Sequence, residues 1–319
     1  MAKAEDSYNE ALKIRRELAA DNPGIFSTDV ANSLNNLGLL YSTKNELDKA
    51  KDAHQESIKI RKKLAEKNPN TFLPDVANSL NNLGLLHSAK NELDKAEDTY
   101  KESIKIYKDL TKSNPDAFSR YLADSLNNLA VLYRAKSELD KAEDTYKESI
   151  KIREKLAEKN PDAFSRYLAD SLNNLANLYK TKNKLDKAEG AYKESIKIRK
   201  KLAEKNPDAF LPYVANSFNN LGALYGDKND LEKAEDAYNE ALKIYRELAK
   251  VNPQAFELDV AATCINFSIF YLQGKEDKKL SIQYAKECIV LCERYLGQVH
   301  RAGQYIDMAK QILNDWKTI

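Results

Sequence analysis

The feature that most constrains this chain is a 46-residue repeat marked by its prolines. Six of the eight prolines stand in Asn-Pro pairs, each 46 residues after the one before: Pro23, Pro69, Pro115, Pro161, Pro207 and Pro253. A fixed period in this range is typical of stacked supersecondary units, each of which packs mainly on its neighbours. At 46 residues a unit, the 319 residues make about seven units. The period therefore predicts one elongated array, although length alone would suggest roughly two domains.

Each unit begins with a segment in which apolar residues follow helical spacing. In the second copy, Val76, Leu80 and Leu83 are spaced i, i+4 and i+7 across residues 74–89. Pro74 suits the first position of this helix, because the first turn does not need its missing N–H. At the position before it, other copies have the favourable N-cap residues Ser27, Ser119 and Ser165. We therefore predict that the first helix of each unit begins there.

A second helix is predicted over residues 93–112, where Tyr100 and Ile104 belong to an apolar stripe. Asn114 ends it, because the following Pro115 disfavours helical geometry in the residue before it. No stretch of the sequence alternates apolar and polar residues with period two. The sequence therefore predicts an all-α fold, an α-solenoid of antiparallel helix pairs with a 46-residue period.

These units resemble the tetratricopeptide repeat, whose pattern is W-x2-L-G-x2-Y, then A-x3-F, then P. The first copy places Leu34, Leu37, Gly38, Tyr41, Ala50 and His54 at those positions, the second Leu80, Leu83, Gly84, His87, Ala96 and Tyr100, and the fifth Phe218, Leu221, Gly222, Tyr225, Ala234 and Tyr238. The family unit has typically 34 residues, so this one is twelve longer. It is similar to the long units of kinesin light chains and of bacterial tetratricopeptide arrays.

The repeat also suggests how the chain is divided. We expect a single tetratricopeptide array over residues 1–319: an incomplete unit with only its second helix (1–22), five complete units (23–252), a divergent sixth unit (253–299) and a C-terminal capping helix (300–319). Because the sequence starts inside a second helix, we expect a fragment of a longer array. The resemblance implies a right-handed superhelix. It also implies a non-catalytic scaffold whose first helices line a concave groove for an extended peptide or protein segment.

The candidate binding residues are two rows of asparagines on the first helices. One row is Asn35, Asn81, Asn127, Asn173 and Asn219, and the other is Asn36, Asn82, Asn128, Asn174 and Asn220. An amide has both donors and an acceptor, so it can pair with a peptide backbone of any sequence. In the family, the asparagine before the Leu-Gly pair often bonds a bound peptide, which points to Asn36 and its equivalents. The alternative is that the asparagines bond neighbouring helices and fix the register between repeats.

Specificity is expected at first-helix positions that differ between copies. One such position holds Asn32, Asn78, Asp124, Asp170 and Asn216, and another holds Leu39, Leu85, Val131, Asn177 and Ala223. At a third position, Arg134 and Lys180 form a modest basic spot that we assign to the groove. A solvated face of mixed charge is the alternative interpretation of this spot.

Composition excludes several other functions. The 51 basic and 49 acidic residues nearly balance, so nothing favours nucleic acid as a partner. No apolar run approaches the roughly 18 residues that span a bilayer, and the start of the chain lacks a signal peptide. The three cysteines do not make a disulfide framework, which favours a cytoplasmic location. The expected partner is therefore a protein or peptide, with neither nucleic acid nor membrane involved; the sequence leaves the oligomeric state open.

No catalytic or cofactor motif is recognisable. There is no Ser/His/Asp arrangement and no glycine-rich phosphate loop, and Cys288 and Cys292 lack a nearby third ligand at zinc-site spacing. We therefore expect no enzymatic activity, no metal and no cofactor. Two alternatives to a scaffold remain open: a sensory or regulatory arm of a larger effector protein, and an engineered repeat protein without a natural ligand.

Overall fold

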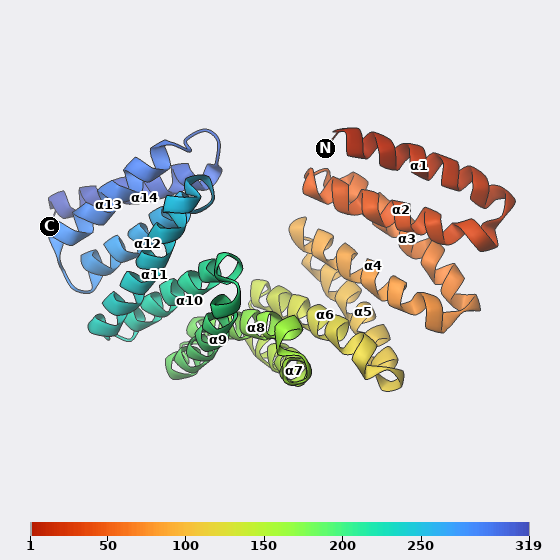
Figure 1. Cartoon of the computed structure of the whole chain (residues 1–319), viewed down its shortest axis with the longest axis horizontal. Coiled ribbons are helices and arrows are strands. Elements are labelled where there is room, and N and C mark those ends of the chain that lie inside the picture. Colours follow the sequence, from red (N-terminus) through yellow and green to blue (C-terminus); the bar gives the residue numbers. More distant parts are fainter. Residues whose placement is uncertain (1, 319) are drawn as a thin grey trace. The chain divides into compact units, whose positions relative to one another are not determined.

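The computed structural model describes residues 2–318 and contains fourteen helices, with no strand among the described residues (Figure 1). Contacts divide the chain into two compact units, residues 1–159 and 160–319, each of which is described by itself. The first unit contains α1 (Ala2–Asp21), α2 (Pro23–Thr43), α3 (Leu47–Lys67), α4 (Pro69–Ala89), α5 (Leu93–Ser113), α6 (Pro115–Ala135) and α7 (Leu139–Lys159). The second contains α8 (Pro161–Thr181), α9 (Leu185–Lys205), α10 (Pro207–Asp227), α11 (Leu231–Val251), α12 (Pro253–Gln273), α13 (Lys278–Glu293) and α14 (His300–Thr318).

Within each unit, successive helices pack as pairs. The first helices α2, α4 and α6 contact the second helices α3, α5 and α7 that follow them, and α3 and α5 also contact the next first helix. The second unit repeats this arrangement with the pairs α8 and α9, α10 and α11, and α12 and α13. The prediction of an all-α solenoid of helix pairs is confirmed. The predicted division into one array with those unit boundaries stays a prediction.

The first helices are longer than the sequence patterns suggested, because each begins at an Asn-Pro pair. Helix α4 is a 21-residue helix with Pro69 in its first turn, so Pro74 lies inside it and not at its start. The serines predicted as N-caps, Ser27, Ser119 and Ser165, likewise lie inside helices. The N-caps are the asparagines before the prolines; the Asn114 side chain, for example, accepts a hydrogen bond from the Ala117 N–H at 3.1 Å.

Asn114 therefore both ends one helix and caps the next. The Asn114 N–H donates to the Leu110 carbonyl at the end of α5, while its side chain caps the start of α6. A single residue outside the helices is enough to turn the chain there, because the pre-proline residue avoids helical geometry and Pro suits the first turn. The prediction that Asn114 ends the second helix is confirmed. The extra twelve residues of the unit lengthen both helices to 21 residues.

In the five complete repeats, a ring on the second helix stands opposite a small residue on the first helix, which lets the two helices approach closely. Tyr100 on α5 is 1% exposed and lies against Gly84 on α4, where an added Cβ would stand 2.6 Å from the ring. Beside it, the buried Ser103 hydroxyl donates to the Ala77 carbonyl on α4 at 2.8 Å. The same serine bond recurs in three other pairs, Ser57 to Ala31, Ser149 to Ala123 and Ser195 to Ala169.

The last repeat encloses the most apolar helix of the chain. By length and composition α12 could cross a membrane, which corrects the expectation that no segment is apolar enough. It packs on α11, α13 and α14, and 61% of its most apolar window is buried inside the structure. The predicted last helix is present as α14, where the Trp316 indole N–H donates to the Ser281 hydroxyl on α13 at 2.8 Å.

The capping asparagines provide a first test. We expect Asn114→Ala to lower the free energy of unfolding by about 1 kcal/mol, because the Ala117 N–H loses its acceptor. Asn68→Ala is the matched control, since Asn68 precedes α4 in the same way without a side-chain capping bond. Urea unfolding followed by far-UV circular dichroism measures both. Equal losses in the two variants would contradict the capping role.

Candidate interaction face of the first helices

In the first unit, an apolar row runs across the first helices beside a row of asparagines. The apolar row is Leu39 on α2, Leu85 on α4 and Val131 on α6, which are 46%, 48% and 38% exposed. Asn36, Asn82 and Asn128 lie one helical turn before them. Together these six residues define what we call the first-helix face. Exposed apolar side chains at the same place in three successive repeats are more than the scattered ones expected on any surface.

The asparagine rows are hydrogen-bonded to each other across neighbouring first helices. The Asn82 amide on α4 donates to the Asn35 side-chain oxygen on α2 at 3.4 Å, and Asn128 on α6 donates to Asn81 on α4 at 3.2 Å. In the second unit, Asn266 on α12 donates to Asn219 on α10 at 3.3 Å. These bonds connect the first helices of adjacent repeats. Each uses one of the donor's two amide hydrogens, so the remaining hydrogen and the oxygen can still meet a ligand.

The remaining predicted asparagines vary in their surroundings. Asn36 is exposed, whereas Asn173 on α8 is 7% exposed and accepts a 3.5 Å hydrogen bond from Ser217 on α10. Asn220 donates to Asn216 one turn earlier on α10 at 3.4 Å. Asn127 on α6 and Asn174 on α8 are half-buried. The two rows therefore differ in access: the first-row members Asn35 and Asn173 are the most buried, and the second row is half-buried or exposed.

Arg134 and Lys180, the predicted basic spot, lie in different units and have different surroundings. Arg134 is half-buried in the last turn of α6. Lys180, in the last turn of α8, forms an ion pair with Asp227 at the end of α10, with 3.1 Å between Nζ and Oδ2. The charge of Lys180 is thus partly balanced by its own chain.

A buried arginine network beneath the first helices was not predicted. Arg199 on α9 is 5% exposed; it donates to Asp170 on α8 at 2.7 Å and to the Tyr213 carbonyl and Ser217 hydroxyl on α10. Arg61 on α3 makes the matching bonds to Asn32 on α2 and to Ser79 and the Asp75 carbonyl on α4. Each arginine therefore joins three helices.

This network changes the interpretation of one variable position. Asp124 and Asp170, which were assigned to ligand specificity, pair with Arg153 and Arg199 of the same repeats at 2.7 Å. Where the second helix has a tyrosine instead, the first helix has an asparagine: Tyr107 with Asn78, and Tyr245 with Asn216. The first repeat combines Asn32 with Arg61, so the co-variation is incomplete and does not by itself identify the pairs. Where the second helix has an arginine, the side chain at this position is bonded within the chain.

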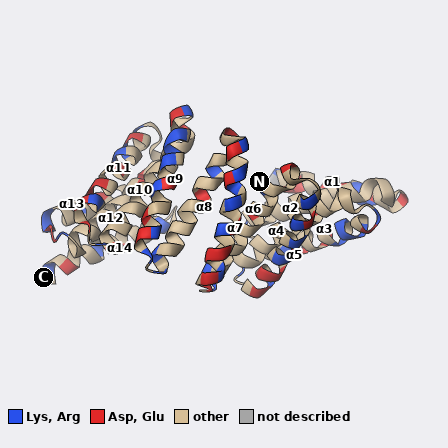
Figure 2. Cartoon of the chain, turned by 90° about the horizontal axis from the view of Figure 1, so that it is seen from below, with Lys and Arg blue, Asp and Glu red and all other residues tan. Residues whose placement is uncertain are grey.

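Charged side chains on the second helices form a separate set of links. Figure 2 shows Lys and Arg intermixed with Asp and Glu along α7 in the first unit and α9 in the second. Lys136, just after α6, binds Asp94 at 2.8 Å and also Glu97, both on α5. Burial alone would raise the pKa of Glu97, but hydrogen bonds from Lys101 and Lys136 lower it to about 2. The charged groups thus neutralise one another locally, consistent with the small net charge.

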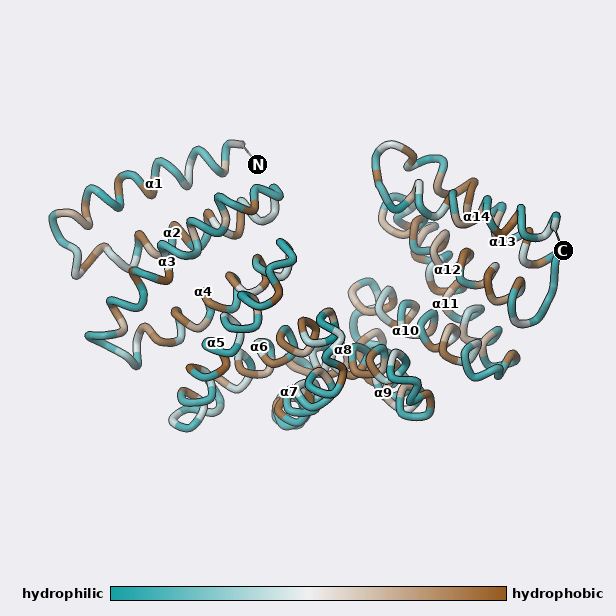
Figure 3. The backbone as a smooth tube through the Cα atoms, turned by 180° about the vertical axis from the view of Figure 1, so that it is seen from behind, coloured by the Kyte–Doolittle hydropathy of each residue, from teal (hydrophilic) through white to brown (hydrophobic). Residues whose placement is uncertain are grey.

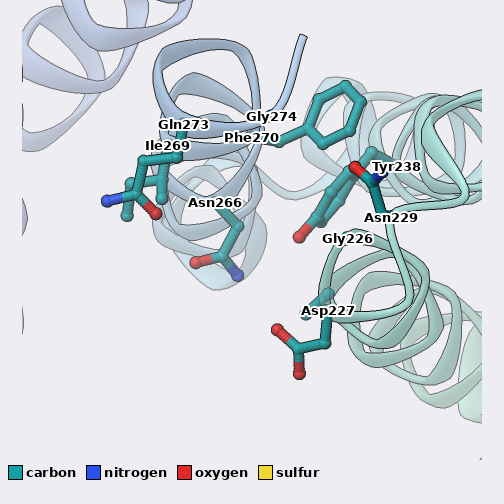
Figure 4. Close-up of a pocket in the computed structure, with 10 residues that line it drawn as sticks. Gly226, Asp227, Asn229, Tyr238, Asn266, Ile269, Phe270, Gln273 and Gly274 are labelled. Atoms are coloured by element: carbon teal, nitrogen blue, oxygen red, sulfur yellow. The ribbon is translucent and has the colours of Figure 1, made fainter. Parts of the chain in front are cut away.

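Cavities open between consecutive first helices. In the second unit, Asn266, Ile269 and Gln273 of α12 and Asp227 of α10 surround a cavity of about 290 Å³ with Tyr238 of α11 at its edge (Figure 4). In the first unit, the corresponding residues of α2, α3 and α4 line a cavity of about 300 Å³. Its walls are more apolar, since Leu39 replaces Ala223, Ala89 replaces Gln273 and no counterpart of Asp227 lines it. Figure 3 shows hydrophobic residues recurring in bands along these helices.

The helix pairs and their first-helix face define a helical repeat protein of the solenoid class. Two family models, both described as tetratricopeptide repeat, match residues 30–70 and 76–115, and residues 121–201 and 201–247. The chain belongs to the tetratricopeptide repeat family. The sequence comparison with curated proteins gave no match.

Solved structures with the same fold include three similar repeat proteins. BtubC (BKLC) from P. vanneervenii is 24% identical with a TM-score of 0.64, over 79% of this chain and 93% of that one. The apo form of RapI is 15% identical with a TM-score of 0.58, over 92% and 93%. A variant of a putative kinesin light chain with nearly identical TPR-like repeats, from Podosopora anserina, is 16% identical with a TM-score of 0.55, over 70% and 98%. At these identities the likeness concerns the fold.

The arginine network can be tested by exchanging one natural pair for another. Asp170→Asn should lower the free energy of unfolding by about 1 kcal/mol, because the buried Arg199 then has an amide in place of a carboxylate, as Arg61 has in Asn32, and Asp170 is partly exposed. Adding Arg199→Tyr recreates the pair found at Asn216 and Tyr245 and should recover at least half of the loss. Urea unfolding of both single variants and the double variant measures the coupling. Additive losses would show that the two residues do not act as a pair.

Proposed function

We propose that this chain is a non-catalytic scaffold that binds an extended peptide or protein segment along the first-helix face. Tetratricopeptide repeats generally mediate protein–protein interactions, and the chain belongs to that family. The observation that carries the proposal is the exposed row of Leu39, Leu85 and Val131 beside Asn36, Asn82 and Asn128. Apolar side chains provide burial for a ligand, and amides provide hydrogen bonds to its backbone.

The spacing of the repeats suits an extended ligand. Packed helices lie roughly 8–10 Å apart, and extended or polyproline II backbone advances about 3.1–3.4 Å per residue. One repeat therefore corresponds to about three ligand residues. A segment with an apolar residue at every third position would present one side chain to each of Leu39, Leu85 and Val131, with its backbone facing the asparagines.

We further propose a cytoplasmic location and a protein or peptide as the partner. The three cysteines, Cys264, Cys288 and Cys292, are free and buried, which supports a reducing environment. The near balance of charge supports a partner other than nucleic acid.

The asparagine face can be tested with two single variants. Peptides that bind the full chain are first selected from a displayed library, and their affinity is measured by isothermal titration calorimetry. We expect Asn36→Ala to weaken binding roughly three- to tenfold with little change in melting temperature, because Asn36 is exposed. Asn128→Ala should lower both the affinity and the melting temperature, because it also loses the bond to Asn81.

The two variants separate the groove from the register interpretation. If the asparagines only fix the register, Asn128→Ala should still lower the melting temperature, while Asn36→Ala should leave binding unchanged. A library that yields no peptide dependent on Leu39, Leu85 or Val131 would contradict the proposed function itself.

A further inference from the structure

One cavity of the second unit lies at the carboxyl ends of two first helices. Asp227 is the last residue of α10 and Gln273 the last residue of α12, and both line this cavity together with Asn266 of α12. Its volume is about 290 Å³. A cavity of ~150 Å³ is enough to hold benzene. This one can therefore hold the polar end of one ligand side chain.

The groups around the cavity favour a positive charge. The carboxyl end of a helix carries a partial negative charge. The helices α6 and α8 have Arg134 and Lys180 in their last turns, whereas α10 and α12, which are described in full, have no basic residue there. The lysines that follow these two helices, Lys228 and Lys275, are paired with carboxylates on α9 and α11. Helix α10 ends in the carboxylate of Asp227, so negative groups converge on the cavity.

The polar side chains of the cavity offer hydrogen-bond acceptors from two helices. Asp227 is exposed, and Asn266 is half-buried. The Asn266 amide nitrogen donates to Asn219, which leaves its side-chain oxygen as an acceptor. Figure 4 shows Asn266 and Gln273 on the α12 side of this space and Asp227 on the α10 side. A guanidinium has five N–H donors that spread in one plane, so it can reach acceptors on both sides, whereas an ammonium is a compact point charge.

The internal partner of Asp227 forms a weak pair that a ligand can replace. Lys180 of α8 lies 3.1 Å from Oδ2, and the two side chains are 31% and 48% exposed. Ion pairs between partly exposed groups contribute little to stability, because water and salt screen them. A guanidinium forms two parallel hydrogen bonds with a carboxylate, which is a stronger arrangement than this single contact.

The other repeats show that the fold does not require a carboxylate at this position. The equivalents of Asp227 in the four preceding complete repeats are Thr43, Ala89, Ala135 and Thr181. All of these neutral residues end first helices of the same length. The acidic group is therefore particular to the fifth repeat, and packing does not explain it.

From these observations we propose that the cavity between α10, α11 and α12 binds the guanidinium group of an arginine in the partner segment. The Asp227 carboxylate accepts two of its N–H bonds, and the side-chain oxygens of Asn266 and Gln273 accept others. Ala223 and Ile269, which also line the cavity, contact the methylene groups of the arginine. The inference rests on the proposed function, because the arginine belongs to a bound segment. It adds the identity of one side chain in that segment and the repeat that selects it.

The first experiment uses small probes and needs no peptide. N-acetyl-argininamide and its neutral analogue N-acetyl-citrullinamide are titrated into the full chain, labelled with ¹⁵N at its nine glycines. Gly226 and Gly274 line the cavity. We expect the arginine probe to shift their amide resonances and to bind roughly tenfold more tightly than the citrulline probe. Equal binding of the two probes, or shifts that do not include Gly226 and Gly274, would overturn the proposal. Equally tight binding of N-acetyl-lysinamide would overturn the choice of arginine.

The decisive variant is Asp227→Asn, which removes the charge and keeps the shape. The arginine probe should lose roughly tenfold or more in affinity, while the melting temperature changes little because Asp227 is exposed. Asp236→Asn is the matched control; Asp236 is exposed on α11 and does not line the cavity, so binding should stay unchanged. An Asp227→Asn chain that stays folded and binds the arginine probe like the native chain would overturn the proposal.

A second variant tests the competition with Lys180. Because Lys180→Gln removes the internal partner of Asp227, the arginine probe should bind roughly two- to fivefold more tightly. Unchanged or weaker binding would contradict the proposed contact between the guanidinium and Asp227.

The small probes and the selected peptides separate this inference from the proposed function. If the arginine probe binds as expected but the library yields no peptide dependent on Leu39, Leu85 or Val131, the proposed function is refuted and the cavity remains a guanidinium site. If such peptides are found but the arginine and citrulline probes bind equally, the proposed function stands and the arginine site is refuted.

Discussion

The structure depends on the close approach of two helices in each repeat, made possible by a small residue opposite a ring. Gly84 lets the buried Tyr100 ring lie against the α4 backbone, and the Ser103 hydroxyl then reaches the Ala77 carbonyl. In the third and fourth copies Ala130 and Ala176 take the place of the glycine, and they too are fully buried. Because the five complete repeats keep a ring opposite a small residue, their first helices present equivalent faces, and the rows of asparagines and leucines arise from that repetition.

Links between repeats are polar and lie on separate surfaces. The asparagine pairs connect neighbouring first helices, the buried arginines connect a second helix to the first helices on both sides of it, and lysines such as Lys136 connect a loop to the preceding second helix. Each link is satisfied within the chain, so most charged groups have a structural partner. The row of Leu39, Leu85 and Val131 in the first unit is exposed instead, and for this reason we propose it as the surface that binds a ligand.

Variation between near-identical repeats separates structural positions from candidate binding positions. Asp170 changes together with Arg199, and the corresponding pair Asn216 and Tyr245 replaces both members at once. His54 and Leu39 also differ together from Tyr192 and Asn177, and this combination lacks the hydrogen bond from the Tyr192 hydroxyl to Asn177. The first kind of change preserves an internal hydrogen bond, and the second kind does not.

The sequence by itself determined the helix-pair solenoid and its family, because the 46-residue period and the apolar spacing are local and repeat many times. It misplaced the helix starts at Pro74 and the serines, since a proline in the first turn and a proline five residues later look alike without knowledge of the N-cap. The partners of Asp170 and Asn35, and the burial of His54, were decided only by the tertiary structure. Their contacts join residues 29 to 47 positions apart, or depend on what surrounds a buried atom. Helical spacing specifies which side of a helix a residue occupies. Packing between helices decides whether that side contacts a neighbouring helix or stays exposed to solvent.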